Sequence, residues 1–171
     1  MATPQHSVLP EHRVLNDGTE VWELDNLPHR EDGPARISPQ GSKCWYLEGR
    51  RHRTGGPAIE MASGTKAWFE QGLRHREGGP AIEIHDGRQR WWFRGRLHRE
   101  DGPAIDDGDG KEEGAWFVHG RELPLDEIIE RKEKMAAQAL QREVHAIAET
   151  MQLGLQNPIQ IKKPPCFGKG I

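Results

Sequence analysis

Apolar residues follow two different rhythms along the chain, and each rhythm predicts a different secondary structure. Up to about residue 123, short apolar clusters alternate with turn residues, as in residues 80–84, the turn 85–87 and residues 90–93. Apolar clusters of four or five residues between glycine-containing turns predict β-hairpins, because glycine readily takes the positive φ of tight hairpin turns. The first two thirds of the chain therefore predict β-structure.

The hairpin pattern repeats with a fixed period. The segment His-Arg-x-x-Gly-Pro-Ala occurs four times in steps of 23 residues, and the same step relates the tryptophans at 22, 45, 68 and 91. Turn glycines share this period, and chance does not supply three markers with one spacing. We expect each unit to contain two strands of four or five residues, and the stacked units to form one twisted antiparallel sheet. The repeated pairs are His29–Arg30, His52–Arg53, His75–Arg76 and His98–Arg99.

A fifth unit departs from the pattern. Trp116 follows Trp91 by 25 residues, and the His-Arg pair is lost, because this unit reads Gly120-Arg121-Glu122-Leu123. We therefore expect the fifth unit to be the terminal one.

The period and the glycine- and aromatic-rich hairpins resemble the MORN-type repeat, in which units of this length stack into a long sheet. The usual Tyr-x-Gly-rich signature is replaced here by the His-Arg-x-x-Gly-Pro-Ala variant, so the resemblance implies architecture and carries over no functional residue. The variant is similar to repeats in uncharacterised bacteriophage proteins, which suggests an origin and no activity.

The second rhythm begins after Pro124. Residues 125–153 lack Gly and Pro, and their apolar residues recur every three or four positions, which predicts an amphipathic helix that Gly154 and Pro158 end. The helix is long enough to cover one face of the hairpin stack. A basic, proline-containing tail follows. The predicted partner-binding residues are Leu125, Ile129, Leu140, Val144, Ile147, Lys162 and Lys163.

The predicted fold class is mainly β: an elongated antiparallel sheet of stacked β-hairpin repeats, with a long C-terminal α-helix and an extended tail. The predicted segments are an N-terminal arm (1–9), the MORN-like repeat domain (10–123), the amphipathic helix (124–154) and the basic tail (155–171).

Composition narrows the cellular setting. The net charge is only −3, and six Trp and 20 Gly accompany a single Tyr, which favours a folded chain over a disordered one. No apolar run is long enough to span a membrane, and the N-terminus does not have the pattern of a secretory signal. The two cysteines fit neither a disulfide framework nor a zinc knuckle. We expect a cytoplasmic protein, or a virion protein if it is phage-encoded.

Catalysis and metal binding are not expected. Equivalent histidines of neighbouring units lie about 10 Å apart, too far to share one zinc ion. The acidic run 100–113 fails the calcium-loop pattern, because Lys111 stands at a ligand position and Val118 at that of the bidentate Glu. None of the serines, nor Cys44, occupies a nucleophile elbow. The sequence therefore predicts no enzyme activity, no metal and no cofactor, and the His-Arg pairs are interpreted as structural groups that fasten each turn to a nearby acid or carbonyl.

Nucleic-acid binding is not expected either, because acids adjoin the repeated arginines and the overall charge is negative. A sheet with two apolar faces needs covering on both, so we expect a non-enzymatic protein-binding or assembly module, with a protein partner or a homo-oligomer, in a bacteriophage structural or accessory protein. The alternative is a phage-encoded inhibitor of a host nucleic-acid enzyme, acting through the acidic turn 100–113 as a mimic surface.

Overall fold

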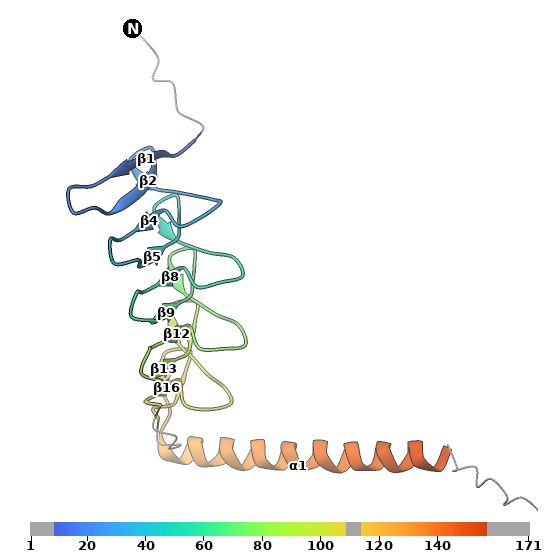
Figure 1. Cartoon of the computed structure of the whole chain (residues 1–171). Helices are drawn as coiled ribbons and strands as arrows, with labels where there is room; N and C mark the ends of the chain where they lie inside the picture. Colours follow the sequence, from blue (N-terminus) through green and yellow to red (C-terminus); the bar gives the residue numbers. More distant parts are fainter. Residues whose placement is uncertain (1–8, 109–113, 157–171) are drawn as a thin grey trace, which may run out of the picture. The chain divides into compact units, whose positions relative to one another are not determined.

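A computed structural model describes residues 9–108 and 114–156, with side chains up to residue 152. The chain divides into two units between Ile128 and Ile129, and each is described by itself. The first unit is an antiparallel β-domain and the second consists of the helix, so the chain is mainly β with one C-terminal helix (Figure 1).

The β-unit is built on a ten-stranded sheet, the main sheet, in which hairpins follow one another in sequence order. Every pairing in it is antiparallel, and β3 pairs only with β2. The strands are β1 (Glu11–Val14), β2 (Glu20–Leu24), β3 (Leu27–Pro28), β4 (Arg36–Ile37), β5 (Lys43–Cys44), β8 (Ile59–Glu60), β9 (Lys66–Ala67), β12 (Ile82–Glu83), β13 (Gln89–Arg90) and β16 (Ile105–Asp106).

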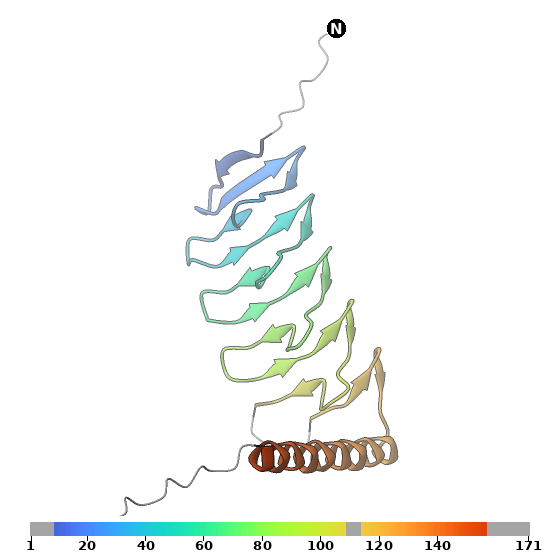
Figure 2. The same cartoon turned by 90° about the vertical axis from the view of Figure 1, so that its right-hand side faces the viewer.

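A second set of hairpins lies beside the main sheet, one for each later unit (Figure 2). These are the second hairpins: β6 (Tyr46–Leu47) with β7 (Arg50–Arg51), β10 (Phe69–Glu70) with β11 (Leu73–Arg74), β14 (Trp92–Phe93) with β15 (Arg96–Leu97), and β17 (Phe117–Val118) with β18 (Arg121–Glu122).

The sequence predicts one continuous sheet of four- or five-residue strands. This is wrong, because the strands are divided between the main sheet and the second hairpins. One strand of each unit does continue through its tryptophan, since Trp45 N–H donates to Ala58 O and Trp45 O accepts from His52 N–H. The neighbouring strand does not continue, because the loop 53–57 interrupts it opposite Trp45. The insertion separates each main-sheet pair from its second hairpin and leaves most strands two residues long.

The second hairpins turn through two residues that both have positive φ, which is typical of a type I′ turn. In β6–β7 these are Glu48 at 48° and Gly49 at 75°. The first unit uses Asp25 and Asn26, at 52° and 63°, so Asn26 takes the place of the turn glycine as the sequence predicts. These turns set the register of each second hairpin.

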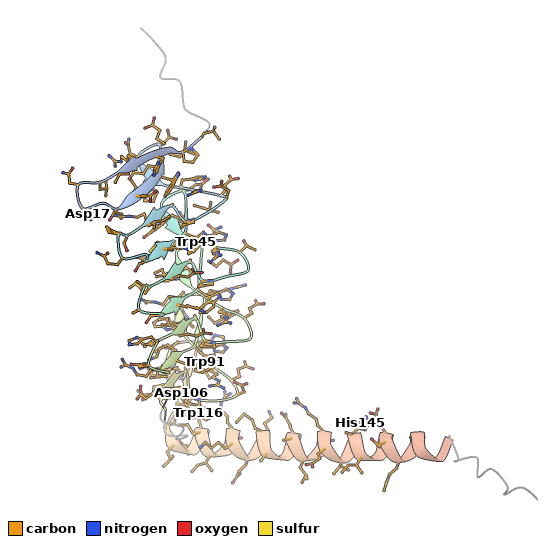
Figure 3. All side chains as sticks on the ribbon, in the orientation of Figure 1. Asp17, Trp45, Trp91, Asp106, Trp116 and His145 are labelled. Atoms are coloured by element: carbon orange, nitrogen blue, oxygen red, sulfur yellow. The ribbon has the colours of Figure 1, made fainter. Side chains whose placement is uncertain are left out.

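The core of the β-unit is thin and consists largely of small residues. Ala35, Ala58, Ala81 and Ala104, from the repeated Gly-Pro-Ala, are completely buried. Trp45 and Phe69 pack with Ala58 and Ala67 in one cluster. Trp45, Trp91 and Trp116 come from separate units along the stack (Figure 3). A core this thin leaves much of the stability to contacts at the sheet surface.

Helix α1 (Leu125–Gln156) is longer than the sequence predicts. Pro124 O accepts from Ile128 N–H, and Asp126 and Glu127 stand in the first turn, where acids complement the helix dipole. Gly154 does not end the helix: a single glycine costs only about 1 kcal/mol in a helix. The helix ends at Gln156, shortly before Pro158. No helix among the described residues has the length and apolarity needed to cross a membrane.

Candidate functional site

The arginines of the repeated His-Arg pairs stack on the tryptophans. Each guanidinium carbon lies 3.8–4.1 Å from the centre of the Trp ring eight residues earlier in the chain. This is the geometry of a cation–π interaction. The pairs are Arg30 on Trp22, Arg53 on Trp45, Arg76 on Trp68 and Arg99 on Trp91.

The same guanidiniums close the inserted loops. In each loop one Nη donates to the carbonyl of the proline four residues later, at 3.0–3.5 Å. Arg30 and Arg99 also bond the Asp two residues later, whereas Arg53 and Arg76 reach Glu60 and Glu83 on the main sheet. The contacts to an acid and to a carbonyl are those that the sequence predicts, and the stacking on Trp is an addition.

Glycine is needed in these loops for a reason of space. A Cβ on Gly33, Gly56 or Gly79 would lie 3.0–3.1 Å from the guanidinium carbon of its loop, and one on Gly102 only 2.7 Å from that of Arg99. Each guanidinium therefore lies between a Trp ring and a glycine. A side chain at Gly33, Gly56 or Gly79 would push it by a few tenths of an ångström, and one at Gly102 would push it further.

The histidines of the pairs make a contact that the sequence does not predict. Nδ1 of each accepts the backbone N–H of the first turn residue in the following second hairpin, at 3.1–3.3 Å. The four bonds join Glu48 to His29, Gln71 to His52, Arg94 to His75 and His119 to His98. His29 and His75 also lie 3.9 Å from the acids that follow them in their own turns, Glu31 and Glu77, as the sequence predicts. The bond from Nδ1 is an addition, which links one unit to the next where the turn residue is held at positive φ.

The fifth unit lacks this histidine because the repeats stop there. Leu123 occupies its place: Leu123 N–H donates to Trp116 O, as His52 N–H does to Trp45 O, and its side chain is buried. With no further hairpin to hold, an apolar residue closes the stack.

Two hollows separate successive loops. One, of about 450 Å³, lies between Arg30 and Arg53, and the next, of about 490 Å³, lies between Arg53 and Arg76. The guanidiniums in their walls already contact Trp rings and loop carbonyls. Most of their hydrogen-bonding capacity is therefore used within the protein.

The part of the chain that the structure describes contains no metal site, and some carboxylates of the acidic run form ion pairs. No group of three or more His, Cys, Asp or Glu there could hold a metal ion. Asp101 and Asp107 of the acidic run pair with Arg99 and Arg90, and residues 109–113 lie outside the described ranges. The described part of the acidic turn is therefore partly neutralised.

The two faces of the main sheet differ sharply in charge. Directly paired residues point to the same face, and one row of them across the sheet alternates acids and bases. It includes Lys43, Glu60, Lys66 and Glu83. Arg53 bonds Glu60, so this face also carries the loops. We call it the loop face.

The opposite row has no carboxylate. It consists of Val21, Arg36, Cys44, Ile59, Ala67, Ile82, Arg90 and Ile105. The second hairpins extend this row: Arg51 lies over Tyr46 and Phe69, and Arg74 over Phe69 and Trp92, at 5.1–5.9 Å. We call the two sets together the arginine–aromatic face.

Cys44 reports on the environment of this face. Partial burial raises the pKa of its thiol, while the nearby charges of Arg51 and Arg36 act to lower it. Both guanidiniums therefore lie near Cys44, and the raised pKa leaves the thiol mostly protonated at neutral pH, so that it reacts slowly. Sequence reasoning missed Arg36, Arg51 and Arg74. A signal was available, because alternation along the strands places no carboxylate in the row from Val21 to Ile105.

The helix carries the predicted partner-binding residues on one side. Leu125, Ile129, Leu140, Val144 and Ile147 are 49–72% exposed. Lys162 and Lys163 of the tail lie outside the described residues.

Comparisons with protein-family models, curated proteins and solved structures find no match to this chain.

Proposed function

We propose that the protein is a non-enzymatic assembly module, in which a MORN-like stack of repeats forms the scaffold and α1 carries the association. The observation that carries this proposal is the apolar side of α1. Five of its large apolar side chains beyond Leu125 are about half exposed or more: Ile129, Leu140, Val144, Ile147 and Met151.

An apolar stripe of this length is expensive to leave in water. Burying one Leu, Val or Ile side chain contributes about 1.5–3 kcal/mol, so five residues provide ample driving force for association. The resemblance of the repeat to those of bacteriophage proteins is the reason for proposing a phage structural or accessory component as its setting.

The arrangement of the histidines and arginines supports a scaffold rather than catalysis. Each Arg is held between a ring and a glycine, and each His joins two units. A catalytic pair would need groups directed at a substrate, whereas these are directed at the protein itself.

The test compares two double variants of the full-length protein by sedimentation and by pull-down from native lysate. Leu140→Asp with Val144→Asp introduces charge into the apolar side, and Gln138→Asp with His145→Asp adds the same charge on the other side of the helix. We expect the first pair to abolish association and the second to preserve it. Equal association by both, or no association by the wild type, overturns the proposal.

A further inference from the structure

We propose that the arginine–aromatic face of the repeat stack is the docking surface for α1 of a second copy of this chain. This inference rests on the proposed function, since it names the partner of the same helix. Three properties of the two surfaces support it: charge, apolarity and length.

The arginine–aromatic face offers unpaired positive charge on an apolar floor. Arg36, Arg51 and Arg74 are exposed and make no ion pair with any described residue. Between them lie half-buried side chains that include Ile59 and Ile82. Trp92 adds a buried indole N–H that has no acceptor among the described residues. A partner for this face should be apolar and should bring carboxylates.

Helix α1 has those properties. At 100° per residue, the half of its surface centred on the apolar stripe carries four acids and one base, Lys132, for a net charge of 1 − 4 = −3. Its other half carries two acids and three bases, for a net charge of +1. The acids beside the stripe are Asp126, Glu130, Glu133 and Glu143. The apolar side of the helix is therefore its acidic side.

The lengths also agree. The stripe from Leu125 to Met151 spans about 39 Å at 1.5 Å per residue. The carboxylate-free row crosses eight strands from Val21 to Ile105, which is about 34 Å at 4.8 Å per strand. Two helical turns rise about 11 Å and two strand spacings cover about 10 Å, so the stripe keeps step with the hairpins along the row.

A second copy is the simplest occupant, because one chain supplies both surfaces. In a twofold pair each helix covers the face of the other copy, and both exposed surfaces are buried by the same interaction. Such a dimer places guanidiniums beside carboxylates at the rim of an apolar interface, where complementary charge provides specificity.

The test is a charge exchange in the full-length protein, followed by sedimentation over a range of concentrations. Arg51→Glu with Arg74→Glu should weaken the dimer about tenfold or more, and Glu130→Arg with Glu133→Arg should do the same. An equimolar mixture of the two variants should recover dimers. In a mixed dimer the acidic face of the first variant meets the basic helix of the second, and the other interface keeps its original charges. The matched control is Arg50→Glu with Arg96→Glu, which reverses two charges on the other side of two second hairpins, β6–β7 and β14–β15, and should leave the dimer unchanged.

A second measurement uses Cys44 as a reporter on the face itself. In a Cys166→Ser background Cys44 is the remaining thiol, and its alkylation should slow as concentration rises and the dimer forms. The inference is overturned if Arg50→Glu with Arg96→Glu weakens the dimer as much as Arg51→Glu with Arg74→Glu does. It is also overturned if the mixture of the two charge-reversed variants fails to recover dimers.

Three further outcomes separate this inference from the proposed function. A monomer in which α1 binds a different protein overturns the second copy as partner but leaves the assembly role standing. A monomer in which Cys44 is protected at every concentration overturns the inference in favour of docking within one chain. Association that survives the charge changes on α1 but is lost in Leu140→Asp with Val144→Asp overturns the arginine–aromatic face alone.

Discussion

The two faces of the repeat sheet both place arginine over aromatic rings, but they differ in what the rest of each guanidinium does. On the loop face, Arg53 stacks on Trp45 at 3.8 Å and uses its N–H groups to hold Pro57 O and Glu60. On the arginine–aromatic face, Arg51 lies 5.5 Å from the Phe69 ring and forms no ion pair with any described residue. The first arrangement builds the fold, and the second leaves charge available to a partner.

The largest expected effect comes from filling the space beside a loop arginine. Gly102→Ala puts a Cβ 2.7 Å from the Arg99 guanidinium carbon, so the arginine must leave its position on Trp91. We expect the free energy of unfolding in urea to fall by about 2–3 kcal/mol. In an Arg99→Ala background the same glycine change should cost little, because the collision is gone. Additive costs would contradict the close packing.

The direct comparison of the two faces uses neighbouring arginines of one unit. Arg53→Ala removes a stacked cation and two charge-assisted bonds, and should lower the free energy of unfolding by about 2 kcal/mol. Arg51→Ala removes only a looser contact on an exposed side chain and should lower it by about 0.5 kcal/mol. Thermal and urea unfolding of both variants measure the difference. Equal losses would mean that the two faces do not differ in their contribution to stability.

A smaller effect is expected from the link between units. His52→Leu removes the acceptor of Gln71 N–H and should lower the free energy of unfolding by about 1 kcal/mol. His52→Asn keeps an acceptor atom close to the position of Nδ1 and should recover part of that loss. His145→Leu on the helix is the control for removing an imidazole and should leave the unfolding of the β-unit unchanged. An Asn variant no more stable than the Leu variant would show that the bond is unimportant.

The smallest expected effect is a pH dependence of thermal stability, which should be present in loops closed by Asp and absent from loops closed by Glu. The hydrogen bond and charge of Arg30 hold the pKa of Asp32 below its ordinary value of 3.8. A lowered pKa in the folded state stabilises the protein above the ordinary value, and this stabilisation is lost as the pH falls through the folded pKa. Asp32→Asn should therefore melt slightly below the wild type at neutral pH and together with it at about pH 2. Thr54→Ala, in a loop without this carboxyl, should show no such pH-dependent difference.

The features that local chemistry determines could be predicted from the sequence. Glycine and asparagine at the positions of positive φ give the hairpins, and the 3.6-residue rhythm gives the helix. The division of the sheet could not be predicted, because the fixed spacing does not show that residues 53–57 leave the ladder opposite Trp45. The stacking of Arg53 on Trp45 had a signal in the constant separation of eight residues, but only the fold shows that this separation brings the two side chains together.

The link made by each histidine was beyond sequence reasoning for a different reason. His52 and the N–H of Gln71 are 19 residues apart, and that N–H belongs to a backbone position that many residue types fill. Glu48, Gln71, Arg94 and His119 occupy the equivalent position in the four linked turns. Because the donor of this bond is a main-chain N–H, no residue type in the sequence marks the position that the histidine binds.

The histidine link also has a consequence for the history of the chain. Arginine closure acts within a unit and the histidine link reaches only the next unit. Removing residues 53–75 would join His52 to Arg76 and regenerate an intact His-Arg-Glu-Gly-Gly-Pro-Ala segment. A gene encoding such a stack can gain or lose 23-codon blocks by unequal recombination and preserve the contacts at every junction. Domain length then changes in steps of about 10 Å, set by copy number.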